Sequence, residues 1–224
     1  TMKKITLPLI VLLIAVLGCS KFKELTGGPS AGGPGGGTGG GSGVSASSDP
    51  KADVIAASRK FIELKSFSAK MDGVGETDIK SQVDFVAPDR FHVKYLGGTG
   101  AGMEMINIGS DSYMKSGGGN WSKIPGTGGR SIPTMRDSFN EEGIKSLTDV
   151  KFEGEDTADG KPALVYSYKN VTPAGDHPFT AKIWIAKSSG IPVKIYAEYP
   201  NGTLKHMTVN FDIDSPVTIE APIK

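Results

Sequence analysis

The sequence has few of the residues that most often carry chemistry. It contains one cysteine, Cys19, and three histidines, so neither an internal disulfide nor a cysteine-based zinc site can form. His92 and His206 fall on polar positions of predicted strands and His177 falls in a predicted loop, a spacing that suits no metal. The sequence also lacks a Gly-x-Ser-x-Gly nucleophile elbow and a correctly spaced phosphate-binding loop. We therefore expect a protein that is not an enzyme and uses no metal or cofactor.

An excess of charge of one sign is also missing. The 25 lysines and arginines are matched by 24 aspartates and glutamates, which leaves a formal net charge of +1. The basic residues form no cluster along the chain, whereas nucleic-acid-binding domains concentrate them in a patch or stripe. The balance argues against nucleic acid as a partner and predicts that most charges lie on a solvated surface.

A hydrophobic run long enough to span a membrane is absent as well. The apolar run Ile5–Leu17 is too short for a bilayer core about 30 Å thick, which takes roughly 20 residues. It follows a basic start and precedes Gly18, which is the order found in a secretory signal peptide. Val16–Cys19 resembles the bacterial lipobox, in which the cysteine is acylated and becomes the new amino terminus. We therefore predict a signal peptide over residues 1–18.

Lipidation at Cys19 predicts attachment to a membrane. Two or three acyl chains hold a protein on a bilayer stably. The expected location is the cell envelope, anchored either to the outer face of the plasma membrane or to the outer membrane. After Cys19 the sequence from Gly27 to Gly43 is nearly all glycine, serine, threonine and proline. Such a segment cannot bury enough apolar area to fold, so residues 19–49 are predicted to be a flexible tether and residues 50–224 a single domain.

Two helices are expected in this domain. Ser48-Asp49-Pro50 is a helix start signal, and apolar residues then recur at three- and four-residue steps. These residues, Val54, Ile55, Phe61 and Ile62, form one stripe that predicts a helix packed on an apolar surface. A second helix is predicted from about Thr134 to Leu147, weakened by Gly143.

The remaining apolar residues alternate with polar ones, which indicates half-buried antiparallel strands. Residues predicted to share a face along each strand are Val83, Phe85 and Ala87; Phe91, Val93 and Tyr95; Ala181, Ile183 and Ile185; Val193, Ile195, Ala197 and Tyr199; and Met207, Val209, Phe211 and Ile213. Turn signals separate the runs, including Asp159-Gly160, Ser189-Gly190 and Asn201-Gly202. The pattern predicts a large meandering antiparallel sheet with one solvated face.

Five short motifs resemble the lipoprotein-carrier superfamily, whose members include LolA, LolB and the LppX/LprG lipoproteins. They cover about residues 52–222 and occur in the superfamily's order. The motifs are Leu64–Met71 (LKSFSAKM), Val86–Phe91 (VAPDRF), Asp111–Trp121, Gly190–Lys194 (GIPVK) and Val217–Pro222 (VTIEAP). This resemblance implies an α+β fold, an incomplete antiparallel β-barrel capped by helices. It also implies a cavity between barrel and helices that takes up acyl chains.

The implied function is binding, and transfer, of a lipid or acylated ligand at the membrane that holds Cys19. Flexible, polarizable methionine suits a cavity that adapts to acyl chains, although methionine also fills ordinary core gaps. The residues expected to line the cavity are Phe61, Phe85, Phe91, Val93, Tyr95, Met103, Met105, Met135, Phe139, Ile183, Ile185, Ile195, Met207, Val209 and Phe211.

One other reading of the sequence stays open. The same half-barrel could serve as a non-catalytic scaffold or as a subunit of an envelope complex, with its interior filled by its own side chains. Envelope proteins would then be the partners in place of a lipid. The sequence names neither the ligand nor the partners.

Overall fold

The computed structural model describes residues 43–98, 100–124, 139–171 and 178–223. In this part of the chain, eleven antiparallel strands form one sheet and two helices accompany it. The elements are α1 (Pro50–Ile62), β1 (Ser66–Gly75), β2 (Ile79–Val86), β3 (Arg90–Gly98), β4 (Met103–Ile108), β5 (Asp111–Ser116), β6 (Ser122–Lys123), α2 (Glu141–Lys145), β7 (Thr148–Ala158), β8 (Lys161–Val171), β9 (Pro178–Ala186), β10 (Pro192–Glu198) and β11 (Leu204–Asp212). None of the described helices combines the length and apolar character that a membrane crossing needs.

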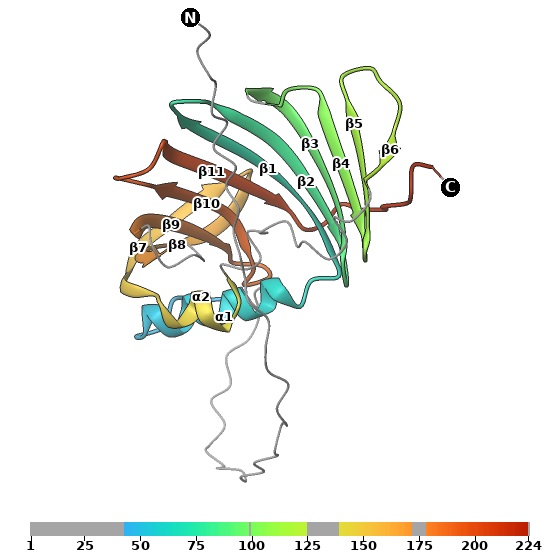
Figure 1. Cartoon of the computed structure of the whole chain (residues 1–224). Helices are drawn as coiled ribbons and strands as arrows, with labels where there is room; N and C mark the ends of the chain where they lie inside the picture. The colour runs from blue at the N-terminus through green and yellow to red at the C-terminus, as the bar shows by residue number, and fades with distance from the viewer. Residues whose placement is uncertain (1–42, 99, 125–138, 172–177, 224) are drawn as a thin grey trace, which may run out of the picture. The chain divides into compact units, whose positions relative to one another are not determined.

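The sheet is a meander with one long-range join. Its strand order is β6-β5-β4-β3-β2-β1-β11-β10-β9-β8-β7, so the first and last strands pair in the middle. Ala69 lies opposite Phe211 and Met71 opposite Val209 in that central pair. The sheet curves strongly, and its edge strands β6 and β7 do not pair with each other in the described part of the chain (Figure 1). The architecture is therefore an open half-barrel, as the sequence predicted.

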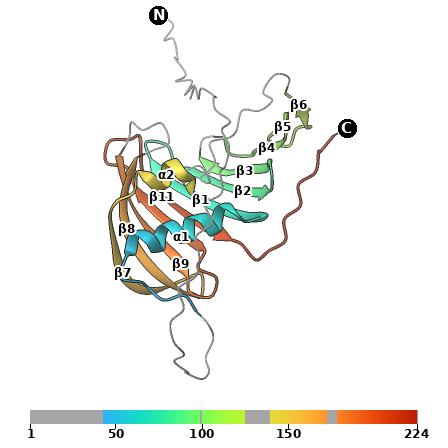
Figure 2. The same ribbon diagram turned by 90° about the horizontal axis from the view of Figure 1, so that it is seen from below.

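Helix α1 begins where its start signal predicts. The Asp49 side chain accepts a hydrogen bond from the backbone N–H of Ala52, and Pro50 occupies the first turn. The Lys51 ammonium donates to the carbonyl of Leu147 at 2.7 Å, and Lys60 donates to the carbonyl of Ser189 at 3.1 Å. These contacts attach both ends of α1 to the segments that flank the sheet, and α1 runs across the curved sheet in Figure 2.

Phe61 of α1 is the centre of the core. Its side chain is fully buried, and its ring lies 4.9 Å from Phe67, 4.6 Å from Phe139 and 4.8 Å from Phe211, centroid to centroid. Phe67 and Phe211 stand on the neighbouring strands β1 and β11. We call the face of the sheet that carries these rings the inner face. Aromatic contacts of this kind add to the free energy gained from burial, so Phe61 fixes α1 on the inner face.

The second helix is shorter than predicted. Residues 134–138 of the predicted helix lie outside the described residues, and α2 covers only Glu141–Lys145. The Asn140 side chain accepts hydrogen bonds from the backbone N–H groups of Glu142 and Gly143, both at 3.0 Å, and so sets the first helical residue. A capping side chain at this position starts a helix, and it outweighs the apolar spacing on which the longer prediction was based.

One predicted strand is shorter than expected and one predicted face assignment is wrong. Strand β2 ends at Val86, so Ala87 lies in a turn, where it still packs against the core that contains Phe85. Val193 was predicted to share a face with Ile195 and Ala197. A register shift between Pro192 and Lys194 instead turns Val193 to the outer face, where it packs with Trp184 and Ala186. A bulge changes the side on which a residue lies, and strict alternation cannot reveal it.

The carboxyl-terminal segment covers part of the outer face. Ile219 is buried with Ile106 of β4 and Tyr113 of β5, and Val217 packs against the same cluster. The Arg90 guanidinium donates to the carbonyl of Ile219 at 2.9 Å. This part of the sheet is therefore shielded from solvent on its outer side by the end of the chain.

A partly buried hydrogen bond joins α1 to β8. The Tyr166 hydroxyl donates to Asp53 Oδ2 at 2.8 Å, and the same oxygen accepts the backbone N–H of Ser47 at 2.9 Å. Desolvation alone would raise the pKa of Asp53, but the hydrogen bonds from Ser47 and Tyr166 outweigh it, and the pKa lies below its ordinary value of 3.8. The ionised carboxylate thus stabilises the packing of α1 on β8.

Replacing Tyr166 by phenylalanine should lower the free energy of unfolding by about 1.5 kcal/mol at neutral pH, because a hydrogen bond to a charged group is lost. The pKa of Asp53 is lower in the folded than in the unfolded chain. Its contribution is therefore present above the unfolded pKa and is lost as the pH falls through the folded pKa. Urea unfolding at several pH values should show the difference between wild type and Tyr166→Phe shrinking below about pH 3.8.

Tyr196→Phe is the matched control. The Tyr196 hydroxyl also donates to a carboxylate, that of Glu198, but at the exposed outer surface. Its loss should change stability by less than about 0.5 kcal/mol. A Tyr166→Phe effect that stays constant from pH 7 to pH 3 would contradict the role assigned to Asp53.

Candidate functional site

The inner face divides into two zones that differ in what covers them. We call the part packed against α1 the helix-covered zone; its buried strand residues are Phe67, Ala69, Phe85, Leu164, Tyr166, Tyr168, Ala181, Ile183, Ile185, Ile195, Ala197, Val209 and Phe211. The second part lies on the inner face of β1 and β3–β5, and we call it the methionine zone. It consists of Met71, Tyr95, Met103, Met105 and Met114.

Strand register brings the methionine zone together. Met105 lies opposite Val93 on β3 and opposite Met114 on β5. Directly opposed residues of antiparallel strands share a face, so these side chains point the same way as Phe85 and Phe91, which also oppose each other. Each of the five residues of the zone is half-buried and none is fully buried. The zone is an apolar surface only partly withdrawn from solvent.

A small cavity lies within the helix-covered zone. Its volume is about 60 Å³, and it lies among Val54 of α1, Phe139, Ile195 and Met207. Ligand sites usually measure about 300–1,000 Å³. An acyl chain therefore enters this zone only if Phe139 or α1 moves.

The cavity holds no charged side chain among its described residues. Its polar members are Ser58, Asn170, Tyr168 and Tyr199. Burial raises the pKa of both tyrosines, so they stay neutral. The Ser58 hydroxyl donates to the carbonyl of Val54 at 2.8 Å, and Asn170 donates to the carbonyl of Gly143 at 3.2 Å. Ser58 and Asn170 are thus hydrogen-bonded within the protein and the tyrosines are neutral, so the cavity suits an apolar group better than an ionised one.

The structure places fourteen of the fifteen predicted cavity residues, and Met135 lies outside the described residues. Twelve stand on strands and face inward, while Phe61 and Phe139 come from α1 and from the turn before α2. The predicted residues do not form a single pocket. Tyr95, Met103 and Met105 belong to the methionine zone, whereas most of the others pack under α1 as a filled core.

Several inner-face residues were missed by the sequence analysis. Phe67 and Met71 flank Ala69 on β1, and Leu164, Tyr166 and Tyr168 alternate along β8. Both runs have a two-residue period, so the same alternation that identified the other strands could have found them. Met114 could not have been found in the same way, because Ser112 and Ser116, its neighbours at that period, are polar.

Histidine and carboxylate groups form no metal site in the described part of the chain. His92 lies on the outer face, as predicted, with Nε2 3.0 Å from Glu104 Oε2. Lys115 lies 2.8 Å from the same carboxylate. The hydrogen bond from Lys115, with that from His92, holds the pKa of Glu104 below its ordinary value. This cluster is an ion-paired surface rather than a binding site.

Comparison with known proteins is informative at the level of structure. No protein-family model matches the sequence, and no curated protein matches it. Among solved structures, lipoprotein LppX from Mycobacterium tuberculosis aligns with a TM-score of 0.59 and 16% identity, covering 76% of this chain and 98% of LppX. LprF from Mycobacterium bovis aligns with a TM-score of 0.59 and 14% identity, covering 82% of this chain and all of LprF (100%). MucB aligns with a TM-score of 0.50 and 15% identity, covering 75% of this chain and 60% of MucB.

LppX and LprF are matched over their whole length, so the likeness extends to the complete half-barrel with its helices. At this level of identity, the shared property is the arrangement of the backbone. The motifs that resembled the lipoprotein-carrier superfamily therefore predicted the architecture correctly. The chain has the open half-barrel fold of LppX-type lipoproteins.

Proposed function

We propose that this protein is a membrane-anchored lipoprotein that binds a lipid or acylated ligand on the inner face of its half-barrel and transfers it within the cell envelope. The observation that carries the proposal is the methionine zone. It is an apolar surface inside a curved sheet, and it is left half-buried where an ordinary core would be closed. Large apolar surfaces of this kind mark binding sites in soluble domains.

The residue types of the zone suit an acyl chain. Four of its five members are methionines, whose unbranched thioether side chains repack around ligands of different shape at low cost. The fifth, Tyr95, offers an apolar ring with a polar tip. The zone borders Phe85 and Phe91 of the helix-covered zone, whose rings lie 5.0 Å apart. A chain seated on the methionines can therefore extend toward the aromatic core if α1 shifts.

The alternative function, a scaffold without ligand, also has an observation in its favour. The rings of Phe61, Phe67, Phe139 and Phe211 pack together in the helix-covered zone, and the cavity described there measures only about 60 Å³. A scaffold needs a rigid filled interior, whereas a carrier needs space or mobility. The two functions are distinguished by whether a bound lipid co-purifies with the protein, which is expected of a carrier and not of a scaffold.

Protein purified under native conditions from its own envelope should carry a non-covalent lipid. Extraction of the folded protein with organic solvent followed by mass spectrometry should detect it in constant ratio to protein. The acyl chains on Cys19 are covalently bound and remain with the polypeptide, so they do not contribute to the extract. Two results together would favour the scaffold: an extract that contains no lipid, and a purified protein that does not bind added fatty acid.

Met105→Trp should block ligand binding, because the indole occupies the centre of the methionine zone. The affinity for a fluorescent fatty acid should fall by at least about tenfold. Lys70→Trp is the matched control, since it adds the same ring to the exposed outer face of β1. Its affinity should equal that of wild type, and far-ultraviolet circular dichroism should show both variants folded. Equal binding by Met105→Trp and Lys70→Trp would place the ligand elsewhere.

Cys19→Ser should release the protein from the membrane. In cells fed a radiolabelled fatty acid, the wild-type chain should be labelled and should sediment with membranes, whereas the variant should be neither labelled nor sedimented. Ser20→Ala, a change at the next residue, should leave both properties intact. Labelling of the Cys19→Ser chain would show that the lipid is attached at another residue.

A further inference from the structure

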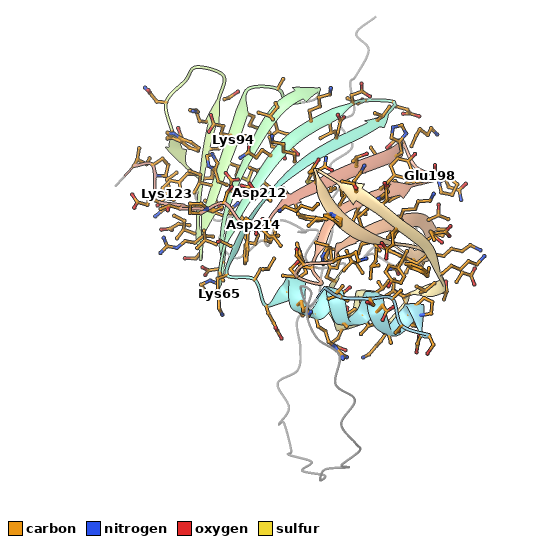
Figure 3. All side chains as sticks on the ribbon, turned by 180° about the vertical axis from the view of Figure 1, so that it is seen from behind. Lys65, Lys94, Lys123, Glu198, Asp212 and Asp214 are labelled. Atoms are coloured by element: carbon orange, nitrogen blue, oxygen red, sulfur yellow. The ribbon has the colours of Figure 1, made fainter. Side chains whose placement is uncertain are left out.

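The outer face of the sheet carries a hollow that is larger than the cavity of the helix-covered zone described above. Its volume is about 700 Å³, within the roughly 300–1,000 Å³ range of ligand sites. Strands β7–β11 form it, on the side of the sheet opposite α1; Figure 3 labels Glu198, at its β10 border. The residues that line it are Asp149, Lys151, Glu153, Ser167, Tyr168, Lys169, Thr180, Ala181, Lys182, Trp184, Lys194, Tyr196, Glu198 and Thr208. Tyr168 and Ala181 border it although their side chains belong to the helix-covered zone of the inner face.

Irregular pairing of β7 accounts for the hollow. The register between β7 and β8 shifts twice, between Thr148 and Lys151 and between Phe152 and Gly154. Bulges bend a strand and increase its twist, so the edge strand β7 departs from the plane of β8–β10. Outward side chains of β7 and of β9–β10 then stand on opposite walls of one depression.

One cross-strand row supplies most of the hydrogen-bond donors. Lys151 lies opposite Ser167, and Ser167 lies opposite Lys182. Lys182 lies opposite Tyr196, which in turn lies opposite Thr208. Neighbouring strands are about 4.8 Å apart, so Lys151 and Lys182 stand roughly 10 Å apart across two strand spacings. The row thus presents the ammonium groups of Lys151 and Lys182 on either side of the Ser167 hydroxyl. The hydroxyls of Tyr196 and Thr208 follow beyond Lys182.

The lysines of this row form no direct ion pair in the described part of the chain, although the charge of Lys151 acts on the nearby carboxylate of Asp149. Within the residues that the structure describes, neither Lys151 nor Lys182 has an ion pair, and both are exposed. Lys194 lies with its ammonium 4.7 Å from the ring centroid of Trp184. Coulomb attraction from these three ammonium groups is therefore available to a ligand.

The carboxylates of the hollow already have partners. Asp149 pairs with Lys169 at 2.7 Å, and Glu198 accepts the Tyr196 hydroxyl at 3.0 Å. Glu153 accepts the Ser167 hydroxyl. Each carboxylate retains further acceptor capacity for a hydroxyl-rich ligand. The hollow thus combines unpaired cations with fixed acceptors.

We propose that this hollow binds an anionic oligosaccharide. A sugar chain with negative groups needs ammonium donors for its charges, and both donors and acceptors for its hydroxyls, and the hollow has all three. The separation of Lys151 from Lys182 suits charges repeated along a chain better than one small ion. A peptide is a poorer fit, because peptide sites rely on buried apolar or aromatic anchor pockets. The site is independent of the lipid-binding function proposed above.

Calorimetry with the full-length protein tests this site. The probes are a hexamer of galacturonic acid, a phosphorylated mannose oligomer and the neutral hexamer of glucose. At least one anionic probe should bind, more weakly as the salt concentration rises, and the neutral probe should not. Lys151→Ser combined with Lys182→Ser should weaken that binding by at least about tenfold.

Lys80→Ser combined with Lys123→Ser is the matched control. These two lysines are equally exposed and paired with Asp72 and Asp111, outside the hollow, and their loss changes the net charge by the same amount. The control should bind the anionic probe within about twofold of wild type. Lipid extracted from the Lys151→Ser, Lys182→Ser protein should match wild type, which separates this site from the inner face. Any of three results would overturn the proposal. Neither anionic probe binds, the neutral probe binds as tightly as an anionic one, or both double variants weaken binding equally.

Discussion

One sheet of eleven strands has a single apolar face, and the rest of the structure depends on how that face is kept from water. A closed barrel would bury the face against itself, but the edge strands β6 and β7 remain apart in the described chain. Helix α1 therefore covers one part of the apolar face. It is held there by the ring of Phe61 and by the hydrogen bond between Tyr166 and Asp53. On the other side the methionine zone stays half-buried. The uneven coverage leaves part of the apolar face half-buried, which supports the ligand-binding function that we propose.

The two faces of the sheet are chemically opposite. The described residues of the inner cavity carry no charge, whereas the outer face carries ammonium, carboxylate and hydroxyl groups in rows. An antiparallel sheet allows this separation because successive side chains alternate between faces. One layer of backbone thus lies between an apolar cavity and a polar hollow, and Tyr168 borders both.

Local features of the fold could be predicted from the sequence, and long-range ones could not. Asp49-Pro50 gave the start of α1, and strict alternation gave β3, β9 and β11. Strand β7 was missed, because it is an edge strand with exposed residues on both faces and hardly any apolar alternation. The bulge at Val193 was missed because it preserves the composition of the run while changing the face. Periodicity shows the side to which a residue points, but not which strand lies beside it. The sequence therefore could not show that Met105 and Ile195 lie in different zones of the inner face. Nor could it show that Ile219 packs on the outer face.

The pairing of β1 with β11 has a kinetic consequence. It joins residues 66–75 to residues 204–212, and every other strand is connected to the core through one of these two. Closing so long a stretch of chain is entropically unfavourable, and folding rates fall as contacts become less local. The half-barrel therefore cannot be completed until the last strand is available. Strand β1 therefore gains its partner β11 only after residues 204–212 have emerged, whether from the ribosome or across a membrane.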